Sequence, residues 1–366
     1  MKILTVVGNR PQFIKAAAVS GPLRKEHEEV LVHTGQHYDD SLSRVFFAEL
    51  GLGAPERELG IGGGTSTSQT ARMLTALEPL LTEVKPDAAL VYGDTNSTLA
   101  GALAAAQADI PVVHIEAGMR SYDRTMPEER NRVVTDHLSD LLLCSSQSAA
   151  EHLRAEAISG RIEVVGDVMV DVALRWQPAA RANTEVLAAH GLMSDSYLLV
   201  TAHRAGNVDD PERLRALVDL IRALPEPVLF PLHPRTRARL NDTGLLAELE
   251  QLDGIQLTEP LGYVEFSALV CHAQAVLTDS GGVQKEAYLA GVPCVTLRAN
   301  TEWVETVDAG WNTLVDLDSS AALAALDHPP PAERDGWGSN PYGDGHAAER
   351  CVEAIGSLEA AKGSSG

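Results

Sequence analysis

The stretch Leu277-Thr278-Asp279-Ser280-Gly281-Gly282-Val283-Gln284-Lys285-Glu286 decides the fold class, because it joins a buried strand to a helix through small residues. The apolar run ending at Leu277 predicts the strand, and the pattern from Val283 to Leu289 predicts the helix. Glycines at such a turn let a ligand approach the backbone, and the N–H groups of a helix start favour a phosphate. The candidate ligands here are Ser280, Gly281 and Gly282 for phosphate and Glu286 for a ribose. The alternative is a connection without any ligand, in which Ser280 only caps the helix.

Length and charge restrict the class of protein. A chain of 366 residues exceeds one comfortable core and predicts two domains. Its 45% hydrophobic and 22% charged residues are typical of a soluble globular protein. The net charge of −22 argues against a nucleic-acid or anionic-membrane partner, because a phosphate polymer would be repelled. A small phosphorylated ligand in a locally positive cleft remains compatible with this charge.

Four widely spaced cysteines form no C-x-x-C pair, which predicts buried thiols in a reducing compartment and neither a disulfide framework nor a metal site. Met1-Lys2 leads directly into the apolar run Ile3–Val7, and no run reaches transmembrane length. We therefore expect a cytoplasmic protein without a signal peptide. The Gly/Ser-rich residues 362–366 are predicted to be disordered.

Short aliphatic runs alternate with helical patterns along the chain, which predicts α/β architecture with parallel strands and helical crossovers. The expected strands are Ile3–Val7, Val30–His33, Ala88–Tyr92, Val112–Ile115, Leu141–Cys144, Glu163–Val165, Tyr197–Val200, Val228–Phe230, Ile255–Thr258, Ala275–Leu277, Cys294–Leu297 and Thr313–Val315. We predict two Rossmann-like doubly wound domains, residues 1–170 and 171–346, which face a central cleft. A helix over 347–361 is expected to cross back to the first domain.

Two cations follow the first predicted strand. Arg10 and Lys15 lie in the turn and helix that come after Val7, where a guanidinium fork and an ammonium would suit a diphosphate. The alternative for Lys15 is an ordinary solvated helix residue.

Three carboxylates lie at or just beyond the ends of later strands. Asp94 follows the run ending at Tyr92, Glu116 follows Ile115, and Glu128 begins a helix whose first residue is Pro127. Like charges at one sheet edge shift each other's pKa, which is how a site obtains an acid and a base together. This pattern indicates acid/base chemistry.

Plainer interpretations exist for the same residues. Asp94 could only cap the next helix, and Glu128 could form a simple i,i+4 ion pair with Arg132.

The second half offers further polar strand ends. His203 and Arg204 follow Val200, His233 follows Phe230, and Arg298 follows Leu297. These side chains are candidates for contact with phosphate or sugar, against an ordinary loop histidine as the alternative for His203.

An aromatic segment precedes the phosphate turn. Tyr263 and Phe266 could stack on a uracil base, or could only pack a helix against the sheet.

Taken in order, these motifs resemble the non-hydrolysing UDP-N-acetylglucosamine 2-epimerases, which have two Rossmann-like domains of the GT-B glycosyltransferase type. The likeness runs from Gly8 to Ala347. The motifs that carry it are GNRPQFIK, TGQHYD, VYGDTNST, HIEAGMRS, MPEERNRV, DHLSDLLLCSS, EVVGDVMVD, TAHRAGN, DSGGVQKEA, RANTEWVET and NPYGDGHA.

The resemblance implies reversible inversion at carbon 2 of UDP-GlcNAc to give UDP-ManNAc, by elimination of UDP to a 2-acetamidoglucal and its re-addition. It implies no cofactor, no metal and a homodimer. The implied catalytic residues are Asp94, Glu116, Glu128 and His203. The implied substrate-binding residues are Arg10, Lys15, Arg132, His233, Tyr263, Phe266, Ser280, Gly281, Gly282, Glu286 and Arg298.

Three departures from the family pattern stand out. Arg204-Ala205-Gly206-Asn207 lacks the acid that many relatives carry after the histidine, and Trp303-Val304 replaces an arginine-proline, which bears on sugar preference. Residues 59–69 do not match the arginine-containing region that some relatives use for allosteric UDP-GlcNAc binding. We therefore expect weak or absent activation through such a second site.

Other functions fit parts of the pattern. An epimerase acting on a uronic or diacetamido derivative, a GT-B glycosyltransferase, a hydrolysing epimerase and a silent nucleotide-sugar sensor would all keep the phosphate turn. The three clustered carboxylates favour an epimerase, because a transferase needs no proton removed from carbon.

Overall fold

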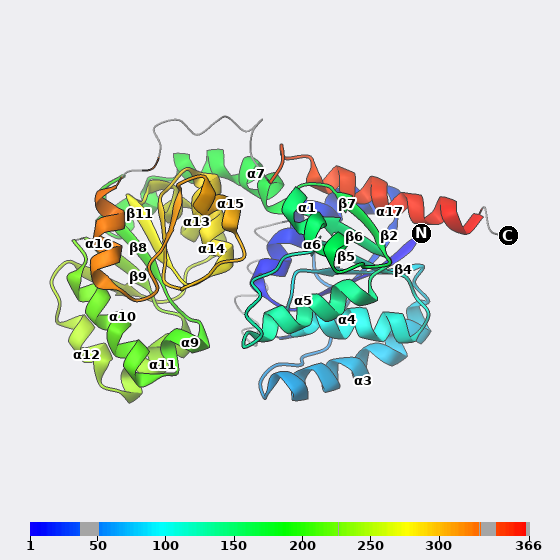
Figure 1. The fold of residues 1–366 in the computed structure, drawn as a ribbon, viewed down its shortest axis with the longest axis horizontal. Coiled ribbons are helices and arrows are strands. Elements are labelled where there is room, and N and C mark those ends of the chain that lie inside the picture. Colours follow the sequence, from blue (N-terminus) through cyan, green and yellow to red (C-terminus); the bar gives the residue numbers. More distant parts are fainter. Residues whose placement is uncertain (37–50, 226, 329, 331–341, 364–366) are drawn as a thin grey trace. The chain divides into compact units, whose positions relative to one another are not determined.

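The protein was analysed as a computed structural model, which describes residues 1–36, 51–225, 227–328, 330 and 342–363. The chain divides into two compact units (Figure 1). The first unit contains Met1–Leu174 and the chain from Asp335 onward, and the second contains Arg175–Arg334.

The first unit is built on a parallel sheet, in which the described residues supply seven strands in the order β3-β2-β1-β4-β5-β6-β7. The strands are β1 (Lys2–Val7), β2 (Glu28–His33), β3 (Arg57–Glu58), β4 (Ala88–Tyr92), β5 (Val112–Ala117), β6 (Leu141–Cys144) and β7 (Arg161–Val164). Strand order reverses between β1 and β4, so the loops at their carboxyl ends diverge and leave room for a ligand.

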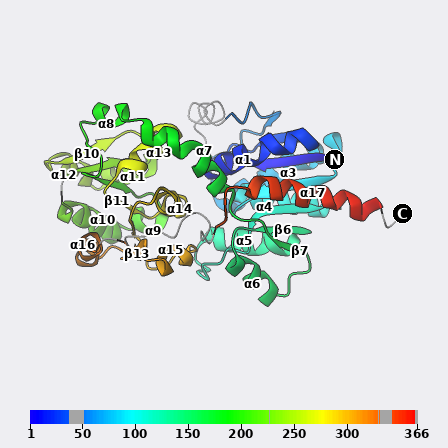
Figure 2. The same cartoon turned by 90° about the horizontal axis from the view of Figure 1, so that it is seen from above.

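Helices cover both faces of this sheet (Figures 1 and 2). They are α1 (Arg10–Glu26), α3 (Ser66–Val84), α4 (Asn96–Gln107), α5 (Pro127–Leu138), α6 (Gln147–Ala155), α7 (Val168–Ala182), which runs across the division between the units, and α17 (Ala347–Gly363). Helices α3, α4 and α5 lie on one face, while α1 and α17 pack together on the other. The Asp171 carboxylate of α7 accepts hydrogen bonds from the N–H groups of Ala347 and Ala348 at 3.2 and 2.8 Å, which fixes the start of α17 in the first unit.

The second unit repeats this topology. Its described residues form six parallel strands in the order β10-β9-β8-β11-β12-β13, again reversing beside the first strand of the unit. The strands are β8 (Leu198–Thr201), β9 (Val228–Pro231), β10 (Ile255–Thr258), β11 (Ala275–Thr278), β12 (Cys294–Thr296) and β13 (Asn312–Leu314). The helices are α8 (Glu185–Ala189), α9 (Ala205–Val208), α10 (Pro211–Ala223), α11 (Pro234–Asp242), α12 (Leu245–Glu250), α13 (Tyr263–His272), α14 (Gly281–Ala290), α15 (Val304–Asp308) and α16 (Ser319–Asp327).

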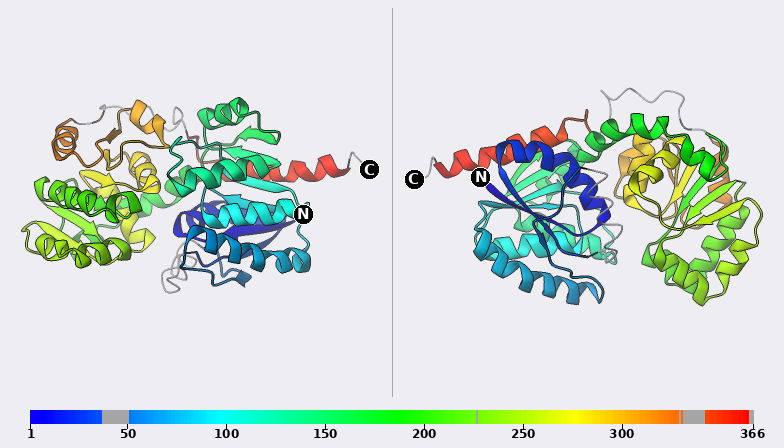
Figure 3. Two further views of the ribbon diagram at one scale, coloured as in Figure 1. Left: turned by 60° about the horizontal axis from the view of Figure 1, so that its bottom comes forward. Right: turned by 180° about the vertical axis from the view of Figure 1, so that it is seen from behind.

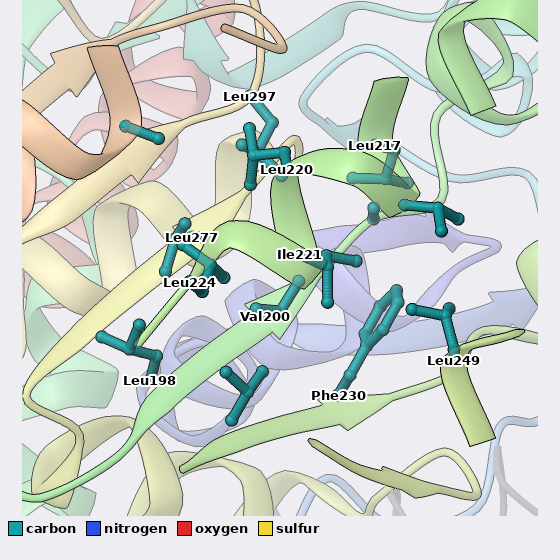
Figure 4. Close-up of a cluster of buried hydrophobic side chains, with 14 of the residues drawn as sticks. Leu198, Val200, Leu217, Leu220, Ile221, Leu224, Phe230, Leu249, Leu277 and Leu297 are labelled. Atoms are coloured by element: carbon teal, nitrogen blue, oxygen red, sulfur yellow. The ribbon is translucent and has the colours of Figure 1, made fainter. Parts of the chain in front are cut away.

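Successive side chains of a strand point to opposite faces of the sheet, so each face of the second sheet has its own hydrophobic core. Leu198 and Val200 of β8 face one hydrophobic cluster with α10 and α12, which Figure 4 shows. Tyr197 and Leu199 face the opposite cluster with α13 and α14. Helices therefore cover both faces of this sheet as well (Figure 3), and the polar groups at the strand ends are left to form sites.

The predicted α/β class with two Rossmann-like domains is confirmed, and each of the twelve expected strands overlaps an observed one. The sequence missed β3, which has two residues and no apolar run. All four cysteines are free and buried, as expected. Across the described residues, none of the helices combines the length and apolar character that a membrane crossing requires.

Three boundaries differ from expectation. The first unit extends to Leu174 and not to residue 170, and it also contains Tyr342 to His346, which were expected in the second domain. Asp167 explains this placement, because its N–H donates to the Tyr342 carbonyl at 2.7 Å. Helix α17 continues through Gly363, where a disordered tail was expected from residue 362.

Candidate active site

In the first unit, the turn between β1 and α1 is fixed by buried side chains. Asn9 caps α1 by accepting a hydrogen bond from the Gln12 N–H at 3.3 Å. The Gln12 side chain accepts from the Gly8 N–H at 2.7 Å and donates to the Tyr92 carbonyl at 2.8 Å. The turns after β1 and β4 are thereby locked together at the point where strand order reverses.

Lys15 of α1 points into this region and not into solvent. Its ammonium forms an ion pair with the Glu116 carboxylate of β5, and the two side chains are only 10% and 9% exposed. Burial alone would lower the pKa of Lys15, but Glu116 and the more distant Asp94 raise it above the usual lysine value. Lys15 is therefore a fixed cation, and the solvated alternative does not apply to it.

Glu116 is held in an unusual backbone conformation. Its φ of +69° lies in the left-handed region, and the register between β5 and β6 shifts between Ile115 and Ala117. Such a bulge turns a side chain away from its regular strand position and costs about 1 kcal/mol or more for a residue with a Cβ. The bulge aims the Glu116 carboxylate at Lys15.

Asp94 follows β4 and forms a second carboxylate–cation pair with Arg132 of α5. The N-cap of α4 is Thr95, whose side chain forms a capping box with Thr98, so the interpretation of Asp94 as the helix cap is wrong. The Asp94 side chain is 31% exposed and the Arg132 side chain 2% exposed. A buried arginine thus presents a carboxylate that solvent or a ligand can reach.

Arg132 does not form the simple i,i+4 pair with Glu128. It contacts Glu129 instead, at 3.1 Å. Glu129 is buried and also accepts hydrogen bonds from the N–H groups of Ser121 and Tyr122 at 3.0 and 2.9 Å. Glu128 lies at the half-buried start of α5, and its carboxylate makes no hydrogen bond or ion pair within the described part of the chain.

The second unit presents the start of α14 at the reversal between β8 and β11. Ser280 is the N-cap residue, as predicted, but its side chain makes no cap hydrogen bond. The helix begins at Gly281, two residues before the predicted Val283, so Glu286 lies in the second turn. An added Cβ at Gly281 would overlap Glu302 Oε1, whereas the nearest atom to a Cβ at Gly282 is Ser280 Oγ at 3.9 Å.

Two arginines flank this helix start. The buried Glu302 carboxylate lies 2.9 Å from Arg298 and 3.5 Å from Arg204. Burial lowers the pKa of Arg298 and Arg204 lowers it further, while Glu302 opposes both effects. The positive end of the helix and two guanidinium groups make this corner suited to an anion.

Asp279 organises the neighbouring loop. It is fully buried, and its carboxylate accepts hydrogen bonds from the N–H groups of His203 and Arg204 at 3.1 and 3.0 Å and from Asn207 Nδ2 at 3.1 Å. The His203 and His233 rings lie 5.2 Å apart, so these two predicted residues belong to one cluster. Sequence reasoning missed Asp279, although an acid directly after a buried strand was a usable signal.

The two predicted aromatic residues lie on one helix. Tyr263 is the first residue of α13, and Phe266 lies in a hydrophobic cluster of the second unit. Trp303, at the position that departs from the family pattern, is buried with the Lys285 ammonium 3.7 Å from its ring centroid. This cation–π contact gives the tryptophan a partner that an arginine could not have.

The predicted site residues therefore form two groups, one in each unit. Lys15, Asp94, Glu116 and Arg132 meet in the first, with Arg10 half-buried at the start of α1. In the second, Ser280 to Gly282 form the start of α14, Arg298 contacts Glu302 next to Gly281, and His203 lies beside Asp279 and His233. The motif residues 37–39 and 340–341 lie outside the described residues.

Comparison with known proteins gives consistent results along the chain. The model of a family described as UDP-N-acetylglucosamine 2-epimerase matches residues 23–356, which excludes Arg10 and Lys15 and covers the other candidates. A Methanococcus maripaludis protein named UDP-N-acetylglucosamine 2-epimerase homolog is 45% identical over 359 residues, spanning 98% of this chain and all of that protein. A Pseudomonas aeruginosa protein named UDP-2,3-diacetamido-2,3-dideoxy-D-glucuronate 2-epimerase is also 45% identical, over 371 residues with 98% and 100% coverage.

Solved structures agree. The crystal structure of Methanocaldococcus jannaschii UDP-GlcNAc 2-epimerase in complex with UDP-GlcNAc and UDP superposes with a TM-score of 0.91 at 41% identity, covering 98% of this chain and 100% of that one. The enzyme from Neisseria meningitidis bound to UDP-GlcNAc has a TM-score of 0.85 at 29% identity, with 97% and 99% coverage. The likeness thus extends over both units.

Proposed function

Because this chain belongs to the UDP-N-acetylglucosamine 2-epimerase family, we propose that it interconverts UDP-GlcNAc and UDP-ManNAc by inverting carbon 2 of the hexose. The observation that carries the proposal is the pair of carboxylates in the first unit, Asp94 and Glu116, each held against a cation. Inversion at a carbon that bears hydrogen requires a base on one face and an acid on the other. Two carboxylates fixed at neighbouring strand ends can supply both.

The reaction proceeds by elimination and re-addition. A carboxylate takes the proton from carbon 2, the C–H electrons form the carbon 1–carbon 2 double bond, and the carbon 1–oxygen bond breaks to release UDP. The intermediate is 2-acetamidoglucal. A UDP oxygen then re-forms the bond to carbon 1 while a protonated group delivers a proton to the opposite face of carbon 2. Asp94, Glu116 and Glu128 are the candidates for these transfers.

The second unit supplies the nucleotide site in this proposal. The N-terminus of α14 and the guanidinium groups of Arg204 and Arg298 stabilise the diphosphate in the substrate and in the departing UDP. Glu286 in the second turn of α14 binds the ribose hydroxyls, and His203 lies beside the phosphate or sugar. No redox cofactor takes part, because hydrogen leaves and returns as a proton.

Incubation of UDP-GlcNAc with the protein in deuterated water tests the mechanism. We expect NMR to show deuterium at carbon 2 of both epimers, with UDP still attached to the product. Free ManNAc would instead indicate a hydrolysing enzyme, and transfer to an acceptor without exchange at carbon 2 would indicate a glycosyltransferase. A nucleotide sugar that binds and remains unlabelled would indicate a sensor.

A modified sugar is the second candidate substrate. The Pseudomonas aeruginosa relative, named for a diacetamido glucuronate, is as similar in sequence as the relative named for UDP-GlcNAc. The buried Lys285 beside Trp303 also gives this chain a cation next to the departure from the family pattern. Measurement of kcat/KM for both nucleotide sugars decides between them, and a preference of more than about ten-fold assigns the substrate.

A further inference from the structure

A buried polar pair lies behind the two carboxylates of the first unit. His114 of β5 and Asp136 of α5 are fully buried, and His114 Nδ1 lies 2.7 Å from Asp136 Oδ1. The other ring nitrogen, Nε2, lies 2.7 Å from the carbonyl oxygen of Gly93, the residue before Asp94.

Both atoms that face the imidazole are hydrogen-bond acceptors. A carbonyl oxygen cannot donate, so Nε2 must carry a proton to make its contact with Gly93. An ionised carboxylate cannot donate either, so Nδ1 must carry a proton to reach Asp136. A neutral imidazole has one N–H and would leave a lone pair facing an oxygen at 2.7 Å.

Asp136 is held in its ionised form by its other partners. The Arg120 guanidinium donates to Oδ2 at 2.7 Å, and the Gly118 N–H donates to the same oxygen at 3.2 Å. Burial would raise the pKa of Asp136, but the hydrogen bond and charge of His114, followed by those of Arg120, lower it below the usual aspartate value. Independently of His114, a guanidinium and a backbone N–H both donate to Oδ2 and favour the ionised carboxylate, so a proton on Asp136 does not replace the one on His114 Nδ1.

These contacts connect the two loops that carry the candidate acids. His114 holds the carbonyl of Gly93, which precedes Asp94, and Asp136 holds the N–H of Gly118, two residues after Glu116. Glu116 is in the left-handed conformation and needs neighbours that keep it there. A single buried pair thus acts on the backbone of both loops.

We propose that His114 is a doubly protonated, buried imidazolium and that His114 and Asp136 are positioning residues, which set Asp94 and Glu116 for proton transfer at carbon 2. The catalytic part of this inference rests on the proposed function, whereas the protonation state does not. The neighbouring strands place Val91 and Leu142 beside His114, and neither carries charge. On the neighbouring strand β6, the Cys144 thiol stays neutral because burial and Asp136 raise its pKa to about 12.

NMR of the full chain labelled with ¹⁵N-histidine tests the protonation state. The His114 resonances are those that disappear in His114→Gln. At neutral pH we expect both ring nitrogens of His114 to have the chemical shift of protonated nitrogen. A ring nitrogen with the shift of an unprotonated imidazole would overturn the inference, whatever the enzyme's activity.

Steady-state kinetics test the positioning role. We expect Asp136→Asn and His114→Gln each to lower kcat about a hundred-fold, because displacement of a reacting group by 1 Å costs about that much. KM should change less than about three-fold. Since the two residues act as one unit, the double variant should be no slower than the single variants. Folded variants with normal kcat, or effects that multiply in the double variant, would contradict the positioning role.

Asp140→Asn is the matched control. The Asp140 carboxylate accepts a hydrogen bond at 2.8 Å from the N–H of Val112, at the other end of the same strand β5. Replacement of the carboxylate by an amide should weaken this hydrogen bond and lower the melting temperature, while kcat should stay unchanged. An equal loss of kcat in this variant would mean that any weakening of β5 slows the enzyme, and the specific role of Asp136 would be refuted.

Discussion

The two units use the same strand order for opposite purposes, as a comparison of Asp94 with Asp279 shows. Each aspartate follows the fourth strand of its unit, which pairs with the first strand; this is β4 in one unit and β11 in the other. Asp94 is 31% exposed and lies against a buried arginine. Asp279 is fully buried and accepts backbone N–H groups of the His203 loop. One position of the fold therefore presents an accessible carboxylate in the first unit and supports a loop in the second.

The helices that follow the two aspartates also differ, in whether side chains cap their first N–H groups. Thr95 and Thr98 close the start of α4 with a capping box that satisfies their own two N–H groups, and the Ser97 N–H donates to Gln36 Oε1 at 3.0 Å. The start of α14 has a serine without a cap hydrogen bond, followed by two glycines. The comparison teaches that topology selects the place where polar groups gather, while two or three residues at the helix start decide whether its N–H groups are capped by side chains, as in α4, or left without a side-chain cap, as in α14.

The largest expected effect is the loss of chemistry without loss of nucleotide binding. Asp94→Asn and Glu116→Gln remove the charged oxygens of the first unit, and each should lower kcat by about 10²–10⁴-fold. UDP affinity, measured by calorimetry, should stay within about three-fold of the wild type, because the proposed diphosphate site lies in the second unit. Glu128→Gln should also slow the enzyme, since Glu128 is the third candidate acid.

Glu151→Gln is the control for these variants. Glu151 is exposed on α6, so its replacement should change neither kcat nor UDP affinity. If Asp94→Asn and Glu116→Gln both turned over normally, the contrast between a chemical unit and a binding unit would be wrong.

A smaller effect is expected at the two glycines of α14. In Gly281→Ala the new Cβ overlaps Glu302 and lies 3.1 Å from Trp303 Nε1, so both stability and UDP affinity should fall, the affinity by about ten-fold or more. In Gly282→Ala the nearest atom to the Cβ is Ser280 Oγ at 3.9 Å, an ordinary van der Waals contact, so thermal stability should be unchanged or slightly higher. UDP affinity should nevertheless fall by about ten-fold if phosphate lies against this backbone.

The two glycine variants distinguish a glycine that is needed for packing from a glycine that is needed for ligand binding. Calorimetric titration with UDP and thermal unfolding of the same samples provide the two readouts. Unchanged UDP affinity in Gly282→Ala would remove the phosphate from the start of α14 and leave Gly281 with a packing role only.

The sequence predicted most of the fold because buried parallel strands are continuous aliphatic runs. The run Ala88–Tyr92 matches β4 residue for residue. Strand β3 escaped prediction because Arg57-Glu58 has no apolar signal and is defined only by its pairing with β2. Local pattern reveals what is buried, but not which neighbour an edge segment joins.

The sequence predicted the type and the chain position of the candidate site residues, but not which side chains they contact. Lys15 and Arg132 were both identified, yet each had an alternative, a solvated helix residue for Lys15 and a helical ion pair with Glu128 for Arg132, and neither ion pair seen here was predicted. The ion pairs join α1 to β5 and α5 to the β4 loop, contacts that follow from tertiary structure and not from helical spacing. Asp136 and Asp279 were missed as organising acids for the same reason, since their partners are backbone N–H groups of other segments.

The smallest expected effect concerns the Ser280 hydroxyl and decides between the two interpretations of the phosphate turn. A serine that served as a helix cap would contribute about 1 kcal/mol, which its replacement by alanine would remove. The Ser280 side chain makes no cap hydrogen bond, so Ser280→Ala should leave the free energy of unfolding within about 0.3 kcal/mol of the wild type. UDP affinity should fall about three- to ten-fold, which corresponds to the net loss of one ordinary hydrogen bond. Denaturant unfolding and UDP titration of this variant give the two numbers, and a destabilised protein with unchanged UDP affinity would restore the ligand-free interpretation.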